Sequence, residues 1–155
     1  MKKEGVLPVY NSVELYFDHG DGVYLYTEDG TRYLDFTSGI GVTCLGHSHP
    51  ALVSALREQA GKLWHCSNLF KIKGQETVAK KIVDHSFASN VFFCNSGAEA
   101  VEAGIKAVRK YFYLNKKNKY KIICVNNAFH GRTLGAISAA GQDKLLEGFD
   151  PRLDG

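Results

Sequence analysis

The sequence predicts an α/β protein, and a strand–helix–strand pattern between residues 91 and 125 is the main reason. Val91–Cys94 is a short apolar run rich in residues that favour strands. From 97 to 113 apolar residues recur at helical spacing, which predicts an amphipathic helix. After a polar connection, the run 121–125 predicts a second buried strand. A strand, a helix and a strand in this order form a βαβ unit, whose crossover is expected to be right-handed.

The segment before this unit predicts a β-hairpin followed by helices. Two β-rich runs, 22–27 and 32–36, flank the dipeptide Asp29-Gly30, which is typical of tight hairpin turns. Pro50 suits the first position of a helix. The remaining expectations are a helix over 50–62, a second helix over 74–85 with Val78, Ile82 and Val83 facing inward, a short helix over 133–140 and an irregular tail over 143–155.

Composition and charge narrow the functional classes. A chain of 155 residues with 45% hydrophobic residues suits one packed domain. A net charge of +3 gives no strong argument for binding nucleic acid or membranes, and the lysines of 116–121 are expected to form a solvated loop. No run has the length of a membrane span, and no signal peptide is expected after Met1, so a cytoplasmic location is predicted. The four cysteines are expected to be free thiols.

The turn between the strand at 91–94 and the following helix has a chemical use. Ser96 and Glu99 have the spacing of a capping box, which predicts the start of the helix there. The first N–H groups of a helix lack internal partners, and a phosphate can bind them where no bulky side chain intervenes. Gly97 and Ala98 leave such room. A turn that is small only for close packing is the alternative, and residue types alone leave both interpretations open.

A second loop, 126–132, is expected at the same edge of the predicted sheet. It follows the strand at 121–125, and ligands bind at the carboxyl ends of strands in open α/β sheets. Phe129 and Arg132 in this loop are therefore candidate binding residues, with core packing and a surface ion pair as their alternatives. Cys44, His47 and His49 resemble metal ligands, but their spacing matches no common zinc pattern and a structural loop is favoured, so no metal is predicted.

Four motifs together resemble one family. The pattern Phe-x-Asn-Ser-Gly-Ala-Glu-Ala-x-Glu-Ala-x-x-Lys-x-x-Arg, starting at Phe93, resembles the phosphate-cradle motif of the class III aminotransferases that depend on pyridoxal phosphate. Ala128–Thr133, Gly46–Pro50 and His65–Phe70 resemble three further motifs of that family, in the expected order. Within the family, Ser67–Phe70 is most similar to the acetylornithine aminotransferase branch.

This resemblance implies a fold, a cofactor and roles for individual residues. The fold would be part of a fold-type-I aminotransferase, with a hairpin of the small domain in an N-terminal segment, 1–48. The first, truncated part of the large cofactor-binding domain would follow over 49–155. Pyridoxal 5′-phosphate would be the cofactor, and the complete enzyme would be a cytoplasmic homodimer. The implied roles are phosphate binding by Ser96, Gly97 and Ala98, stacking of Phe129 on the pyridine ring and pairing of Arg132 with the substrate carboxylate.

The implied reaction is transfer of an amino group from N-acetylornithine, or a similar ω-amino acid, to 2-oxoglutarate in arginine biosynthesis. Ornithine, 4-aminobutyrate and succinylornithine enzymes of the same class remain alternatives, as does a non-catalytic binding module. No lysine in the sequence lies in a motif that matches the family's Schiff-base lysine, whose position falls beyond residue 155. The chain is therefore expected to be the N-terminal portion of such an enzyme, without a catalytic residue and inactive alone.

Overall fold

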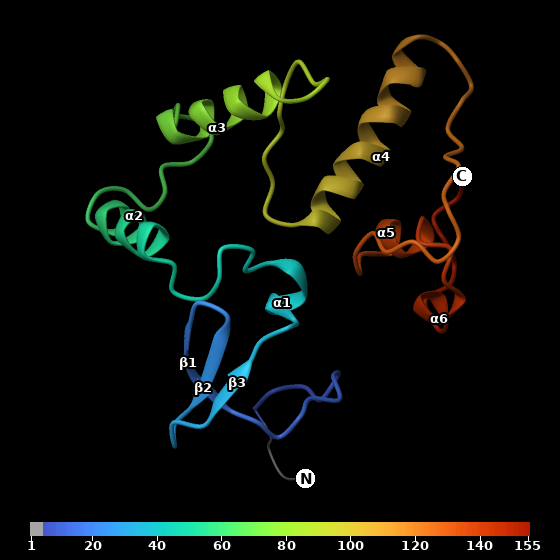
Figure 1. Cartoon of the computed structure of the whole chain (residues 1–155). Coiled ribbons are helices and arrows are strands. Elements are labelled where there is room, and N and C mark those ends of the chain that lie inside the picture. Colours follow the sequence, from blue (N-terminus) through green and yellow to red (C-terminus); the bar gives the residue numbers. More distant parts are fainter. Residues whose placement is uncertain (1–4) are drawn as a thin grey trace. The chain divides into compact units, whose positions relative to one another are not determined.

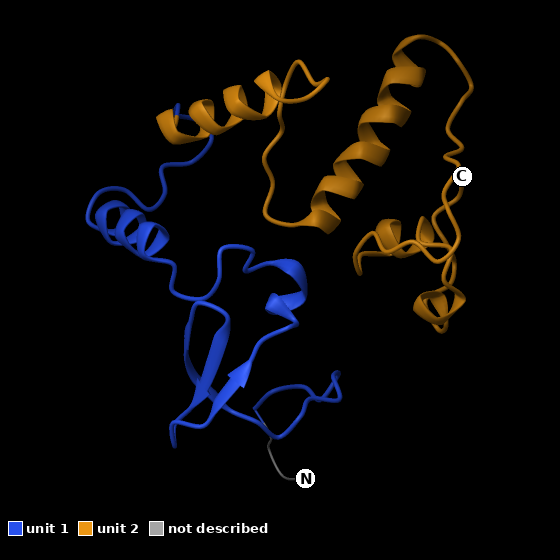
Figure 2. Ribbon diagram, in the orientation of Figure 1, with its two compact units in different colours: residues 1–71 blue, residues 72–155 orange. Residues whose placement is uncertain are grey.

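The computed structural model describes residues 5–155, which belong to two compact units, Met1–Lys71 and Ile72–Gly155 (Figure 2). The first unit holds a small sheet and two helices, and the second unit is helical with long extended connections (Figure 1). The predicted domain division at 48/49 refers to a complete enzyme and stays a prediction. The elements are β1 (Phe17–Asp21), β2 (Tyr24–Thr27), β3 (Arg32–Leu34), α1 (Ser38–Gly41), α2 (Pro50–Ala60), α3 (Lys73–Asp84), α4 (Gly97–Leu114), α5 (Leu134–Ser138) and α6 (Asp143–Leu146).

The first unit contains the predicted hairpin. Strands β2 and β3 pair antiparallel, with Leu25 opposite Tyr33, so this prediction is confirmed. In the connecting turn the Asp29 Oδ1 atom accepts the Thr31 N–H at 3.0 Å. Strand β1 adds a third antiparallel strand next to β2, in a segment where the sequence showed little pattern. Its register shifts between Phe17 and His19, and such an interrupted pairing leaves no clean two-residue alternation to detect.

A glycine-rich loop is tied to the end of this hairpin. Gly22 and His47 exchange two backbone hydrogen bonds, of 3.0 and 2.7 Å. The His47 ring Nε2 lies 2.7 Å from Asp35 Oδ2, and the other carboxylate oxygen of Asp35 accepts hydrogen bonds from Thr37 and from the Ser38 N–H. Gly46 has φ +84°, and a Cβ atom there would lie 2.8 Å from the Gly22 carbonyl oxygen. The loop's glycine is therefore required by its close approach to the hairpin.

Asp35 makes the stability of this loop depend on pH. Hydrogen bonds from the Thr37 hydroxyl, then from the His47 ring and the Ser38 N–H, hold the pKa of the Asp35 carboxyl well below its ordinary value of 3.8. Since the unfolded chain binds the proton more readily, the stabilisation is complete above about pH 3.8 and is lost as pH falls through the lower folded pKa. We expect the Asp35 carboxyl to titrate below 3.8 by NMR, with Ser38 amide protection declining in parallel. Asp35→Asn is the control that removes this titration, and a midpoint at the ordinary value would contradict the prediction.

Helices dominate the second unit, and the larger ones match the sequence. The predicted helices over 50–62, in the first unit, and 74–85 and 97–113, in the second, correspond to α2, α3 and α4 within a few residues at each end. Helix α5 is shorter than predicted, and α6 forms in the tail that was expected to be irregular. None of the helices within residues 5–155 has the length and apolar character needed to cross a membrane.

The two predicted central strands are wrong for this chain. Residues 91–94 and 121–125 run without strand pairing in the described structure, and Phe92, Ile123 and Val125 are mostly exposed. The described buried apolar core consists of Ala136, Ile137, Ala140 and Leu146, so Val78 and Ile82 of α3 are not inward either. A parallel strand is stabilised by neighbours that are distant in sequence, and in the described structure neither run pairs with such a neighbour. The apolar pattern is therefore present without the βαβ sheet that it predicts.

Candidate functional site

The start of α4 has the cap that the sequence predicts. The Ser96 Oγ atom accepts the Glu99 N–H at 3.2 Å, and the Glu99 carboxylate accepts the Asn95 N–H at 2.6 Å. The capping box is thus confirmed, with the return hydrogen bond made to Asn95 rather than to Ser96 itself. A hydroxyl that accepts a hydrogen bond keeps its own proton available. Ser96 can therefore cap the helix and still donate to a bound anion.

The first turn of α4 leaves its backbone N–H groups accessible. Within residues 5–155 no hydrogen bond is found for the N–H groups of Gly97 and Ala98. A Cβ atom added at Gly97 would meet no other atom within 4 Å, so the space beside Gly97 is open. The 18-residue helix also directs the positive end of its dipole here. These properties fit a phosphate group, and a side chain at Gly97 would take up the same space.

The loop 126–132 lies against this turn. A Cβ atom at Gly131 would be 2.6 Å from the Ala98 Cβ, which shows how closely the two backbones approach. The loop is anchored on its other side, because the Asn127 N–H donates to the Gly141 carbonyl and the Gln142 side chain donates to the Ala128 carbonyl. The structure therefore brings together the two segments that were predicted to converge, even though the strands that were to position them do not form.

Phe129 and Arg132 face each other within this loop. The Arg132 guanidinium carbon lies 5.7 Å from the centre of the Phe129 ring, a cation–π arrangement. Phe129 is 65% exposed, so core packing does not explain it in this chain. Among the described residues Arg132 has no ion pair, so its donors are available to a ligand. Arg132 also lines a depression of about 530 Å³ whose other walls include Leu134, Lys144 and Phe149.

A polar link between α4 and α5 holds the far end of the loop. The Thr133 hydroxyl donates to the Glu102 carboxylate at 2.6 Å and accepts the Ala136 N–H at 3.3 Å. This link was not predicted, because Glu102 precedes Lys106 by four positions and such a pair suggests an exposed face of the helix. The available signal was spacing: Glu102 follows Ala98 by four residues, which places both on the face of α4 that meets the loop.

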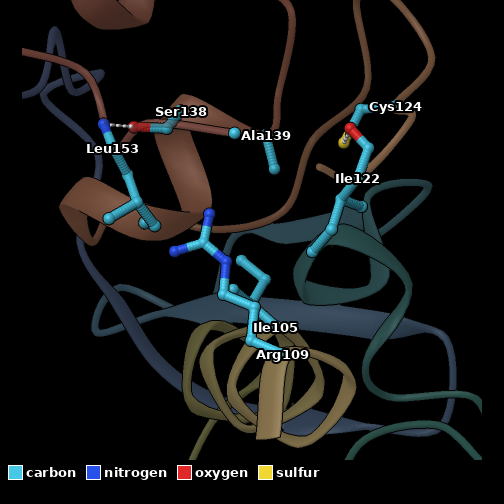
Figure 3. Close-up of a pocket in the computed structure, with 9 residues that line it drawn as sticks. Ile105, Arg109, Ile122, Cys124, Ser138, Ala139 and Leu153 are labelled. Atoms are coloured by element: carbon cyan, nitrogen blue, oxygen red, sulfur yellow. Dashed lines mark hydrogen bonds between the residues drawn. The ribbon is translucent and has the colours of Figure 1, made fainter. Parts of the chain in front are cut away.

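Further along α4 the same region borders a small cavity of about 50 Å³ (Figure 3). Ile105 and Arg109 approach it from α4, and Ser138 and Ala139 close it on the side of α5. Arg109 donates to the Asp154 carbonyl, and the Leu153 N–H donates to the Ser138 hydroxyl at 2.9 Å. None of the predicted binding residues lines this cavity, which is filled at its edge by the chain's own residues 153–155. It is a packing feature rather than a candidate site.

The loop with Cys44, His47 and His49 does not form a metal site in the described structure. No group of three histidine, cysteine or carboxylate side chains gathers within residues 5–155. The His47 ring is engaged by Asp35, a contact that holds the loop in place. All four cysteines are free thiols.

Gly131 offers a direct test of the contact between the loop and α4. Its φ of +117° and the approach of Ala98 both disfavour a side chain. A side chain in such a conformation costs about 1–3 kcal/mol, so Gly131→Ala should lower the hydrogen-exchange protection of the Asn127 and Ala136 amides about tenfold or more. Gly104→Ala is the matched control: a Cβ there meets nothing within 4 Å, and alanine favours a helix interior. Equal protection in both variants would contradict the close contact.

Comparisons with known proteins place the chain in a family. The family model for class-III aminotransferases matches residues 8–155. The chain is 50% identical to the acetylornithine aminotransferase of Mesorhizobium japonicum over 100% of its own length and 39% of that protein. It is 52% identical to the Aquifex aeolicus acetylornithine aminotransferase over 94% of this chain and 39% of the relative. The chain thus spans about two-fifths of these curated relatives and matches their N-terminal region.

Solved structures give the same relationship. The ornithine aminotransferase of Toxoplasma gondii superposes with a TM-score of 0.90 at 28% identity, covering 98% of this chain and 36% of that one. The adenosylmethionine-8-amino-7-oxononanoate aminotransferase of Methanocaldococcus jannaschii superposes with a TM-score of 0.84 at 35% identity, covering 89% and 32%. These neighbours are fold-type-I aminotransferases, so the α/β arrangement described above is part of that fold. The chain belongs to the class-III aminotransferase family.

Proposed function

We propose that this chain is the N-terminal part of a pyridoxal-phosphate-dependent aminotransferase that transfers an amino group from N-acetylornithine, or a similar ω-amino acid, to 2-oxoglutarate in arginine biosynthesis. The observation that carries the proposal is the approach of Gly131 to Ala98, which brings a phosphate-sized backbone turn beside the loop of Phe129 and Arg132. The proposal includes a homodimeric, cytoplasmic complete enzyme, as the family resemblance implies.

The residues present fit pyridoxal phosphate at one end of the site. The backbone N–H groups of Gly97 and Ala98, which have no hydrogen-bond partner among the described residues, would donate to the phosphate together with the Ser96 hydroxyl. The Phe129 ring would lie against the pyridine ring, and the planar guanidinium group of Arg132 would bind the substrate carboxylate. When bound, the cofactor supplies the electron sink for transamination, and the protein's part is to hold and orient it. The lysine that would hold it covalently is proposed to lie in the remainder of the enzyme.

Sequence identity favours the acetylated substrate over free ornithine. Acetylornithine aminotransferases from several bacteria match at 47–53% identity. The ornithine enzyme of Toxoplasma gondii is only 28% identical, although its fold superposes well. The residues named here would bind the phosphate of the cofactor and the substrate carboxylate, and N-acetylornithine and ornithine both carry that carboxylate. The choice between N-acetylornithine and ornithine therefore rests on the similarity to relatives and requires a measurement.

The test uses a joined enzyme, in which residues 1–155 replace the matching segment of the Mesorhizobium japonicum relative. We expect the joined enzyme to bind pyridoxal phosphate and to use N-acetylornithine with a higher kcat/KM than ornithine, 4-aminobutyrate or succinylornithine. The 155-residue chain alone should show no turnover. A joined enzyme that folds and binds no cofactor would contradict the proposal and favour a non-catalytic binding module. A preference for another ω-amino acid would correct the substrate.

A further inference from the structure

The link between Glu102 and Thr133 lies in the part of the molecule where the two candidate binding segments meet. Glu102 follows Ala98 by one helical turn, and Ala98 contacts the loop at Gly131. Thr133 directly follows Arg132 and is the N-cap of α5. The two side chains are joined by a hydrogen bond of 2.6 Å across 31 positions of sequence. The link therefore connects the helix that carries the phosphate turn to the end of the loop that carries Phe129 and Arg132.

The surroundings of this carboxylate explain why its position is well determined. Glu102 is half-buried. A Cβ atom added at Gly135 would lie only 2.5 and 2.6 Å from the two carboxylate oxygens of Glu102. Gly135 is buried in the first turn of α5. The glycine thus makes room for the carboxylate, which lies directly against the α5 backbone. A side chain at residue 135 would require the Glu102 carboxylate to move from this position.

The Thr133 hydroxyl completes the link in the other direction. It donates its proton to Glu102 and accepts the Ala136 N–H, so one oxygen atom joins α4 to the cap of α5. A hydroxyl has one proton and two lone pairs, and this arrangement uses the proton and one lone pair. A hydrogen bond to a charged acceptor is stronger than a neutral one and more sensitive to geometry. The end of the loop 126–132 is consequently held against α4 at two neighbouring points, Gly131 beside Ala98 and Thr133 bonded to Glu102.

We infer that Glu102 is a positioning residue: through Thr133 it sets the placement of Phe129 and Arg132 relative to the phosphate-binding turn of α4. The inference rests on the proposed function, because only a ligand that contacts both segments makes their relative placement matter. Glu102 itself contacts no part of the ligand in this assignment. Its role is to hold the loop so that Phe129, which would contact the pyridine ring, and Arg132, which would bind the carboxylate, lie at a fixed distance from the phosphate.

The first experiment measures the link in the full 155-residue chain without any cofactor. Thr133→Val keeps the shape of the side chain and removes the hydroxyl, whereas Thr133→Ser keeps the hydroxyl. We expect Thr133→Val and Glu102→Ala to reduce the hydrogen-exchange protection of the Asn127 and Ala136 amides about tenfold or more, the range for a hydrogen bond to a charged group. Thr133→Ser should retain the protection. Equal protection in Thr133→Val and the parent chain would overturn the inference.

The second experiment separates positioning from stability in the joined enzyme loaded with pyridoxal phosphate. The readouts are the visible circular dichroism of the bound cofactor, which reports its orientation, and the KM for the amino donor. We expect Thr133→Val to change the dichroism and to raise KM about tenfold, with Thr133→Ser restoring both. Glu102→Asp shortens the link without removing the charge and should raise KM in the same direction. These variants also keep the test informative if Glu102→Ala does not fold.

Two outcomes distinguish this inference from the proposed function. If Thr133→Val lowers thermal stability but leaves the dichroism and KM of the loaded enzyme unchanged, Glu102 is structural only and the inference is overturned while the proposed function stands. If the joined enzyme folds and binds no pyridoxal phosphate even with the link intact, the proposed function fails. The exchange experiment on the 155-residue chain would still report on the link itself.

Discussion

Replacing Ala98 by glutamate should weaken pyridoxal phosphate binding to the joined enzyme by about a hundredfold or more. Ala98 is half-buried, and its Cβ lies where Gly131 comes closest to α4, so a longer side chain must displace the loop or enter the phosphate position. A carboxylate about 4 Å from a phosphate adds a like-charge repulsion of roughly 4 kcal/mol at a partly exposed site. Lost hydrogen bonds from the backbone to a charged group would each cost about 1.5–3 kcal/mol more. A titration followed by cofactor absorbance measures the effect.

Gly104→Glu is the matched control for this variant. It places the same charge on the same helix, at a position where an added Cβ meets no atom within 4 Å. The control should bind the cofactor nearly as the parent does, because its charge lies on an exposed part of α4. Similar weakening in both variants would indicate a general charge or folding effect. Unchanged affinity in Ala98→Glu would remove the first turn of α4 from the phosphate site.

Features determined by neighbouring residues were predictable from the sequence. The hairpin follows from Asp29-Gly30 between two β-rich runs, and it forms where expected. The start of α4 follows from Ser96 and Glu99, whose hydrogen bonds involve residues at most four positions apart. The contact between the turn and the loop was also anticipated. Its expected cause was a shared sheet edge, whereas the observed cause is the packing of 131–135 on α4.

Features that depend on distant partners were not predictable in the same way. The runs at 91–94 and 121–125 have the composition of buried strands, but backbone pairing requires neighbours that lie outside them. The spacing of Glu102 and Lys106 suggests a pair on the exposed face of the helix, whereas the observed partner of Glu102, Thr133, lies 31 positions away. Nothing in the helical period of α4 identifies that partner. The candidate site was therefore predictable as a set of residues, while the link that holds it was not.

Replacing Arg132 by alanine should lower kcat/KM for the amino donor at least about tenfold while cofactor affinity changes little. Arg132 is exposed, has no ion pair among the described residues and lies over the Phe129 ring, so its guanidinium group is available for a carboxylate. Loss of a charge-assisted hydrogen bond costs about 1.5–3 kcal/mol, and about 1.4 kcal/mol corresponds to a factor of ten. Loss of an exposed cation–π contact costs about 0.5–1 kcal/mol, which limits any indirect effect on the cofactor through Phe129 to about fivefold.

The two effects can be separated by measuring cofactor dissociation and steady-state kinetics on the same variants of the joined enzyme. Arg132→Lys keeps the charge without the planar fork and should recover part of the lost kcat/KM. Arg152→Ala is the matched control, because Arg152 is an exposed arginine of the same unit that pairs with Asp143 rather than facing the loop. It should leave both measurements unchanged. If Arg132→Ala instead releases the cofactor and the loaded variant keeps its kcat/KM, Arg132 supports the cofactor and the carboxylate of the substrate is bound by another residue.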